Sequence, residues 1–291
     1  GRKVSAHYQR NLRSRMERLI RETKIHRLSD LDDSRMRLWL ARAERAGLAP
    51  ATRNEYLVTA HAFCNWAVAT HRLAANPLTR VEKAEARSDA RHKRRALTVE
   101  EVRRLLEAAR KRPVAELGRE RVRHAGKSIG RSKAGRWSMA PLTQDCLDAA
   151  YERGSDVLID APGKQARLQQ IGRERALFYL VAVTTGLRKG ELASLTVGQV
   201  HLNTCKPHIE LLARDSKSGK EARIPLRSDV AGQLRDHLAS QMAEGKGLQE
   251  GQRKLRSERP CNARLFPHPP SIRVFDRDLL AAGLAKMDDT G

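Results

Sequence analysis

The sequence predicts a mainly helical protein with a small antiparallel β-sheet (α+β), divided into two domains. Apolar residues recur at helical spacing over much of the 291-residue chain. Two short apolar segments after residue 207 are the clearest strand candidates. Residues 79–96 contain almost no apolar side chains and separate an N-terminal from a C-terminal pattern. The chain length also fits about two domains.

The N-terminal domain, residues 1–78, is expected to consist of three helices. The first covers residues 4–24, and the second follows the capping residues 31–34. The third begins at Pro50, because proline suits the first turn of a helix. Its apolar positions fit a period near 3.6, and Asn76-Pro77 ends the domain.

The C-terminal domain, residues 97–291, opens with a strong helix start. Thr98 and Glu101 have the spacing of a capping box, and Leu97 and Val102 occupy the two hydrophobic-staple positions. A basic insert at about 111–173 follows, and its pattern predicts no definite structure. The side chains expected on the buried face of the first helix are Val99, Val102, Leu105, Leu106 and Ala109.

Short strands are predicted for residues 208–213 and 221–226, joined by the polar turn 214–220. Pro225 implies an edge position or a strand end, because proline donates no ladder hydrogen bond. Two further helices are expected, one capped by Ser228 and one over residues 271–284. A two-strand hairpin between helices is therefore predicted.

The net charge points to a polyanionic partner. The chain has 57 Lys and Arg against 34 Asp and Glu, a net charge of +23. Nucleic acid is the default partner of so basic a protein, although charge alone does not separate an enzyme from a passive binder. Residues 79–96 read either as a solvated charge run or as a linker that follows DNA. We favour the linker, with Lys93, Arg94 and Arg95 as its DNA contacts.

The cysteine and histidine spacings predict no metal site and no cofactor. Four cysteines lie more than fifty residues apart, and no histidine pair has the i, i+4 spacing of a helical metal site. The sequence has no phosphate-binding G-x-x-x-x-G-K-[ST] loop, no apolar run of membrane length and no secretory core. We expect a soluble, cytoplasmic protein with reduced thiols.

The most informative string is Thr185-Gly-Leu-Arg188-Lys-Gly-Glu191-Leu-Ala-Ser-Leu195, which follows the apolar run 176–183. It places one arginine at a glycine-flanked turn at the head of a helix. The planar guanidinium fork suits phosphate, and a helix N-terminus attracts anions. The alternative is an arginine that merely pairs with Glu191, which would be favoured for an isolated R-x-x-E.

The whole string resembles the first active-site box of the tyrosine recombinases, the phage-integrase family. The resemblance implies that Arg188 is the first catalytic arginine and Glu191 its supporting acid. Ser216-Lys-Ser-Gly-Lys220, followed by Ile224-Pro-Leu226, resembles the hairpin that carries the family's catalytic lysine. That role falls to Lys217, with Lys220 as second choice. Taken alone, either lysine is an ordinary exposed turn residue.

The N-terminal domain resembles the family's SAM-like core-binding domain. Its looser motifs are Leu48-x-x-x-Thr52-x-Asn54-x-Tyr56-Leu57 and Leu73-Ala-Ala-Asn76-Pro77. The resemblance implies a two-domain clamp on double-stranded DNA, built from this domain and a partial integrase-type catalytic domain. Arg53 and Asn54 are candidate DNA contacts, and so is Lys220. Family members work as tetramers on paired sites, so a homo-oligomer is also implied.

The resemblance also implies the chemistry. A tyrosine attacks the scissile phosphate and forms a 3′-phosphotyrosyl bond, so rejoining needs neither ATP nor a metal. The arginine stabilises charge on the non-bridging oxygens, and the lysine donates a proton to the departing 5′ oxygen. The sequence thus predicts site-specific DNA recombination or integration by strand breakage and rejoining.

One departure is large. The family's H-x-x-R box and nucleophilic tyrosine follow the region resembled by residues 275–284, and this sequence ends at Gly291. We therefore expect a truncated recombinase that binds DNA without cleaving it. The alternatives are a non-catalytic DNA-binding regulator and, with less support, an RNA-binding protein. The tyrosines present, none in a matching context, are Tyr8, Tyr56, Tyr151 and Tyr179.

Overall fold

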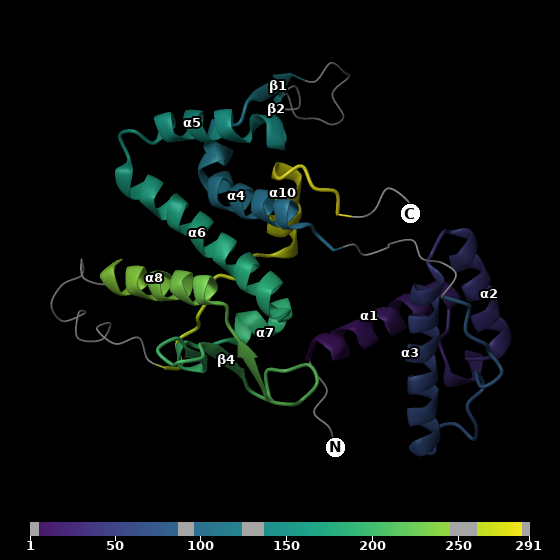
Figure 1. Ribbon diagram of the computed structural model, residues 1–291. Helices are drawn as coiled ribbons and strands as arrows, with labels where there is room; N and C mark the ends of the chain where they lie inside the picture. The colour runs from purple at the N-terminus through teal and green to yellow at the C-terminus, as the bar shows by residue number, and fades with distance from the viewer. Residues whose placement is uncertain (1–5, 87–95, 124–136, 245–260, 287–291) are drawn as a thin grey trace, which may run out of the picture. The chain divides into compact units, whose positions relative to one another are not determined.

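The computed structural model describes residues 6–86, 96–123, 137–244 and 261–286 (Figure 1). The described residues up to 86 and those from 96 onward form two compact units. Helices dominate both units, and two small antiparallel sheets lie in the second, which confirms the predicted fold class. Within the described ranges, every helix is too short or too polar to cross a membrane.

The N-terminal unit contains the three predicted helices. They are α1 (Ala6–Thr23), α2 (Asp33–Arg45) and α3 (Pro50–Ala69), with a 3-10 helix at Leu28–Asp30. The Asp32 carboxylate caps α2 by accepting the Arg35 N–H at 2.7 Å. The core of this unit is formed by side chains from all three helices, including Leu19, Met36, Trp39, Leu57 and Cys64.

The first part of the predicted linker belongs to this unit. Leu78 and Val81 are buried in its core. The Asn54 side chain donates to the Ala84 carbonyl and accepts the Ala84 N–H, both at 2.8 Å, and Arg37 donates to the Arg80 carbonyl. Residues 79–86 are therefore packed, because a single buried valine and backbone hydrogen bonds suffice to fix a stretch that looks polar. The remainder of the predicted linker, residues 87–95, lies outside the described residues.

The second unit begins at α4 (Val99–Ala115), whose predicted capping box is confirmed. The Glu101 N–H donates to Thr98 Oγ1 at 3.2 Å, and the Thr98 N–H donates to the Glu101 carboxylate at 2.8 Å. The expectation of a buried Val99 is wrong, since its side chain is 81% exposed. Val99 is the first helical residue and lies at the edge of the apolar stripe, where few neighbours reach it.

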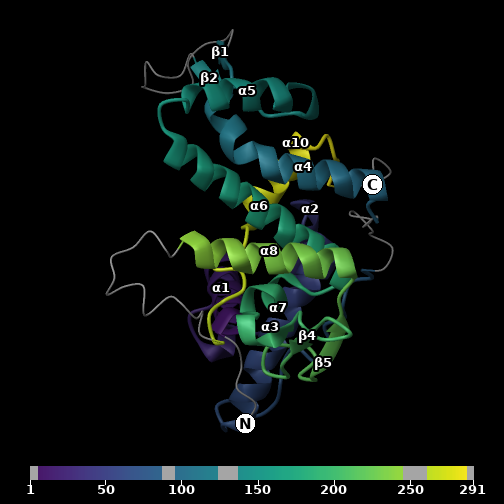
Figure 2. The ribbon, with the colours of Figure 1, turned by 60° about the vertical axis from the view of Figure 1, so that its left-hand side comes forward.

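The sequence pattern assigned no definite structure to residues 111–173, but much of the described part of this range packs into the core. After α4 come β1 (Arg121–Arg123), β2 (Trp137–Met139), α5 (Leu147–Val157) and α6 (Pro162–Thr185), with short 3-10 helices at Glu116–Gly118 and Gln144–Cys146. Figure 2 shows α4, α5 and α6 packed together.

Two glycines allow α5 and α6 to pack closely against α4, which is difficult to predict from the sequence. A Cβ on Gly154 of α5 would lie 2.3 Å from the Val114 carbonyl, and a Cβ on Gly172 of α6 would lie 2.2 Å from the Arg110 carbonyl. Both helices therefore approach the α4 backbone more closely than any side chain allows. In a sequence, glycine normally indicates a turn or a loop, so its packing role inside helices was missed.

The remaining elements follow α6. A three-stranded antiparallel sheet has the order β3 (Val200–His201), β4 (His208–Leu211), β5 (Ala222–Pro225). The predicted β4–β5 hairpin is confirmed, with Ile209 opposite Ile224 and Pro225 at the end of an edge strand. Two helices complete the unit, α8 (Ser228–Glu244) and α10 (Ile272–Ala281).

Candidate active site

Arg188 lies at the junction of two helices. Helix α6 ends at Gly186, whose φ of +69° turns the chain away, and Arg188 is the N-cap residue of α7 (Lys189–Ser194). The leucines on either side, Leu187 and Leu192, are buried. The Arg188 side chain itself is 64% exposed. The sequence string thus forms a rigid turn that directs one guanidinium outward.

Glu191 is the buried centre of this turn. One carboxylate oxygen, Oε2, accepts the Arg188 N–H at 2.9 Å. The other, Oε1, accepts Arg188 Nη1 at 3.1 Å and the Lys217 N–H at 3.1 Å. These hydrogen bonds, first of all that from the Arg188 N–H, lower the pKa of Glu191 below its ordinary value of 4.5, against the opposing effect of burial. The carboxylate is therefore held ionised.

Lys217 lies in the loop between β4 and β5. The Ser216 N–H bonds the Leu212 carbonyl and the Gly219 N–H bonds the Ser216 carbonyl, both at 3.1 Å, so the loop folds back on itself. The Lys217 side chain is exposed, while its backbone N–H reaches Glu191. The structure therefore brings together Arg188, Glu191 and Lys217, which the sequence places in two separate motifs.

The pairing of Arg188 with Glu191 is present, but it does not bury the arginine. Within the described residues, the side-chain contact made by Arg188 is the single bond from Nη1. Its exposed fork can still bind an anion, while Glu191 fixes the direction in which it points. The ion pair and the phosphate clamp are thus compatible.

Of the other predicted DNA contacts, the structure describes Lys220, Arg53 and Asn54. Lys220 is exposed near the end of the β4–β5 loop. Arg53 is buried on α3 and pairs with Glu44 at 2.8 Å, and Asn54 bonds the Ala84 backbone. Both α3 side chains thus have partners inside the N-terminal unit, and their contact with DNA stays a prediction. Three predicted contacts, Lys93, Arg94 and Arg95, fall outside the described residues.

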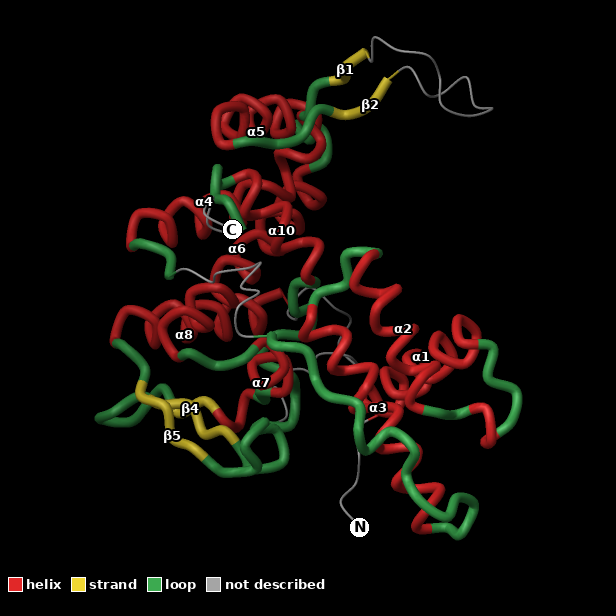
Figure 3. Tube along the Cα trace, turned by 90° about the vertical axis from the view of Figure 1, so that its right-hand side faces the viewer, coloured by secondary structure: helices red, strands yellow, loops and turns green. Residues whose placement is uncertain are grey.

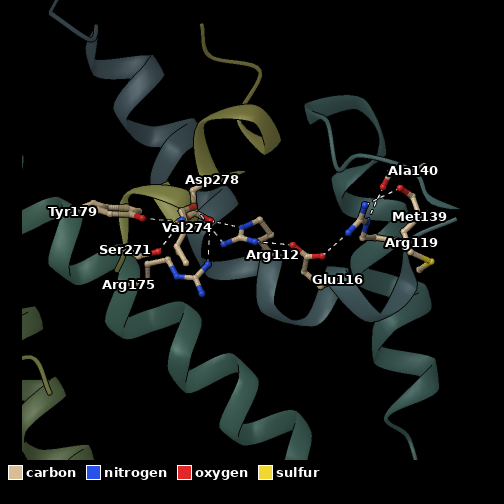
Figure 4. Close-up of polar contacts among 10 residues, drawn as sticks. All are labelled: Arg112, Glu116, Arg119, Met139, Ala140, Arg175, Tyr179, Ser271, Val274 and Asp278. Carbon is tan, nitrogen blue, oxygen red and sulfur yellow. Dashed lines mark hydrogen bonds and ion pairs between the residues drawn. The ribbon is translucent and has the colours of Figure 1, made fainter. Parts of the chain in front are cut away.

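A second charged cluster, missed by sequence analysis, surrounds Asp278 of α10 (Figure 4). This fully buried carboxylate accepts hydrogen bonds from Arg112 at 2.5 Å, Arg175 at 3.1 Å and Tyr179 at 2.7 Å. Burial, and then the charge and hydrogen bond of Asp278, raise the pKa of Tyr179 well above its usual range. The sequence could not predict this cluster from a local pattern, because its members come from three helices.

Three of the four tyrosines pack or form hydrogen bonds within their units, and Tyr8 is 46% exposed. Tyr179 is buried against Asp278, as the apolar run around it indicated. Tyr56 is buried in the N-terminal unit, where its ring lies 4.9 Å from that of Trp39. Tyr151 accepts a bond from Gln169 at 3.2 Å. Among the described residues, no group of three or more His, Cys, Asp or Glu side chains could hold a metal ion.

Comparison with known families identifies the segment that carries the site. Residues 157–256 match the model of the phage integrase family. This match supports assignment of the chain to that family. The matched segment includes Arg188, Glu191 and Lys217. None of the curated proteins matches the chain in sequence.

Three solved structures are similar to this chain. The integrase of the transposon Tn1549, in complex with transposon right end DNA, has a TM-score of 0.45 and 15% identity over 83% of this chain and 61% of that one. XerA recombinase has a TM-score of 0.32 and 14% identity over 98% and 73%, respectively. An integrase from mycobacterium phage Brujita has a TM-score of 0.25 and 12% identity over 94% and 92%. The chain thus spans about three fifths of the Tn1549 integrase structure.

Proposed function

We propose that this chain is part of a site-specific recombinase that breaks and rejoins duplex DNA through a 3′-phosphotyrosyl intermediate. The observation that carries the proposal is the Glu191 carboxylate, which bonds both the Arg188 guanidinium and the Lys217 backbone. Two cationic side chains thereby extend from one rigid centre. Such an arrangement suits a phosphodiester, whose negative charge increases during attack.

The two cations have different tasks in this proposal. The planar Arg188 fork stabilises the non-bridging oxygens, because it presents parallel N–H donors in a fixed geometry. The Lys217 ammonium gives a proton to the departing 5′ oxygen. Glu191 positions both and touches neither reacting atom. The chemistry requires no metal or nucleotide cofactor.

Duplex DNA is the proposed substrate. The net charge of +23 supports phosphate binding that weakens steeply with salt. In this proposal, residues 1–78 act as the core-binding domain together with the packed residues 79–86, the rest of the predicted linker 79–96 follows the DNA backbone, and residues 97–291 supply the catalytic site. Lys220 and the cluster of Lys93, Arg94 and Arg95 are further proposed DNA contacts. Assembly into tetramers on paired sites belongs to the same proposal.

The recombinase needs a nucleophilic tyrosine, whereas a DNA-binding regulator on the same scaffold does not. Tyr179, the tyrosine within the matched segment, is buried and bonded to Asp278. We therefore expect these 291 residues to bind duplex DNA without forming a covalent adduct. The same burial favours the second candidate function, a DNA-binding regulator that retains the scaffold without the chemistry.

The gene beyond the Gly291 codon discriminates between the two functions. An H-x-x-R box and a downstream tyrosine support the recombinase, and a stop codon supports the regulator. A covalent adduct between DNA and the 291 residues alone would show that one of the present tyrosines is the nucleophile. It would contradict the expected absence of cleavage by this chain and also the regulator.

Arg188→Ala tests the assigned chemistry in the protein that includes the nucleophile. Strand cleavage should fall by about 100-fold or more, the usual effect of removing one oxyanion donor, while duplex affinity stays nearly constant. The control is Arg223→Ala, an exposed arginine on β5 that leaves Glu191 and its bonds intact. Equal loss of cleavage and affinity in the Arg188 variant would indicate a purely binding role.

A further inference from the structure

The two-stranded ribbon of β1 and β2 has no cover from the rest of the described chain. All six of its residues are exposed, and Figure 3 shows it extending away from the helices near α5. Trp137 is 58% exposed, Val122 43% and Met139 39%. An isolated two-stranded ribbon is marginally stable in water. Such a concentration of exposed apolar surface on it indicates a binding partner.

The two faces of the ribbon differ in chemistry. Arg121 lies opposite Met139, and Arg123 lies opposite Trp137. Because side chains alternate along a strand, these four residues share one face, and Val122 and Ser138 share the other. One face therefore combines two guanidinium groups with an indole and a thioether.

The charge of this region selects the kind of partner. Residues 121–139 contain six Lys and Arg and no Asp or Glu. Arginines beside a tryptophan suit a surface that offers both phosphates and flat apolar groups, and duplex DNA offers both. The width of the major groove admits a two-stranded ribbon, and some DNA-binding proteins use strands in this way.

The base of the ribbon is firmly fixed. Arg119 donates to the Ala140 carbonyl at 2.7 Å and to the Met139 carbonyl at 2.9 Å, and it pairs with Glu116 at 3.0 Å. Glu116 also binds Arg112 at 2.6 Å, and Arg112 in turn binds Asp278 (Figure 4). This chain of ion pairs attaches the ribbon to α4 and α10. A preset ribbon loses little conformational entropy when it binds.

We propose that the β1–β2 ribbon is a separate duplex-DNA contact of the C-terminal unit. Arg121 and Arg123 bind backbone phosphates, and Trp137 packs against the sugars or base edges of the groove. The inference rests on the proposed function and adds a contact outside the Arg188 site. The proposed DNA contact accounts both for the exposure of Trp137 and for the lack of Asp and Glu in residues 121–139.

The first test is the double variant Arg121→Ala/Arg123→Ala in the full chain, titrated against a labelled mixed-sequence duplex at several salt concentrations. Affinity should fall roughly tenfold, and the slope of log K against log salt should decrease in magnitude by about 2, since each phosphate contact contributes about 0.9. The control Arg103→Ala/Arg277→Ala removes the same charge from exposed positions on α4 and α10. It should leave affinity within about twofold.

The second test uses the fluorescence of Trp137. In a Trp66→Phe background, the two remaining tryptophans are the buried Trp39 and the exposed Trp137. Duplex DNA should protect Trp137 from acrylamide quenching. Trp137→Ala should weaken binding about fivefold or more, in the range found for aromatic contacts to bases. Circular dichroism of each variant checks that the fold is retained.

The outcomes separate the two levels of proposal. If the unaltered chain does not bind duplex DNA, the proposed function fails and the ribbon inference fails with it. If that chain binds but the ribbon variants match it, or match the charge control, only the ribbon inference fails. If Trp137→Ala instead abolishes self-association and leaves DNA affinity unchanged, the ribbon is a protein contact and the inference is overturned.

Discussion

The C-terminal unit contains two buried carboxylates that use their arginines in opposite ways. Around Asp278, the Arg112 side chain is 5% exposed and the carboxylate is fully enclosed by Arg112, Arg175 and Tyr179. Around Glu191, the carboxylate is also buried, with 7% of its side chain exposed, but the Arg188 side chain is 64% exposed. The arginines around Asp278 are mostly buried, whereas the arginine beside Glu191 is mostly exposed to solvent.

The difference shows how a binding site can be recognised among ion pairs. A buried charge must be compensated within the protein, and Asp278 uses its partners for that compensation. Glu191 is satisfied mainly by backbone N–H groups, which leaves most of the Arg188 fork for an external anion. A buried carboxylate that supports an exposed arginine is therefore the more informative arrangement for function.

The largest expected effect comes from Asp278→Asn. Removing one partner of a buried charge cluster leaves Arg112 and Arg175 uncompensated, so the free energy of unfolding should fall by about 3–5 kcal/mol. Urea unfolding followed by circular dichroism measures this loss. A loss under about 1 kcal/mol would mean that the cluster is hydrated like a surface ion pair.

Tyr179→Phe should cost about 1.5–3 kcal/mol at neutral pH, because it removes one hydrogen bond to a charged acceptor. The folded state raises the pKa of Tyr179 above its ordinary value of 10.0 and so holds the phenolic proton more tightly than the unfolded state does. The stability advantage of tyrosine should therefore shrink as the pH rises above 10. An advantage that is constant across the alkaline range would contradict the pairing with Asp278.

Glu191→Gln should cost less, about 1–2 kcal/mol, because the amide oxygen keeps part of the hydrogen bonding. The stability difference between glutamate and glutamine at position 191 should decrease toward acidic pH, whereas that for Tyr179 decreases toward alkaline pH. The folded state lowers the pKa of Glu191, so the advantage of glutamate is complete above 4.5 and disappears as the pH falls through the folded-state pKa. Unfolding curves of both proteins from neutral to acidic pH test this. An advantage that persists at the acidic end would argue against an ionised carboxylate.

Arg188→Ala should have the smallest effect on stability, less than about 1 kcal/mol, because its side chain is mostly exposed. Its effect on phosphodiester cleavage is the large one proposed above. Parallel unfolding curves of this variant and Asp278→Asn give the sharpest comparison. Equal losses would remove the distinction between a structural and a functional cluster.

Local hydrogen bonding explains which features the sequence predicted well. The helix starts at Thr98 and Pro50 depend on residues within one turn, and so does the bond between Arg188 and Glu191. The hairpin that carries Lys217 depends on two adjacent segments and the turn between them. Interactions within one helical turn, or between two strands joined by a short turn, leave a pattern that can be read directly from the chain.

Other expectations failed for reasons that are not local. Residues 79–86 looked like free linker because one buried valine, Val81, gives no periodicity. Residues 111–173 showed no definite pattern, because a sequence does not reveal that Gly154 and Gly172 each permit a close approach to α4. Val99 continued the apolar stripe, but 81% of its side chain is left exposed by the described residues.

The sequence by itself determined the helical class of the protein, its hairpin and the residue types of the candidate site. Only the tertiary structure decided which of those residues meet. The Lys217 N–H reaches Glu191 because the β4–β5 loop folds against α7, and Asp278 meets Arg112 because α10 packs on α4. A charge that is buried needs a partner, and no short stretch of sequence specifies which distant residue supplies it.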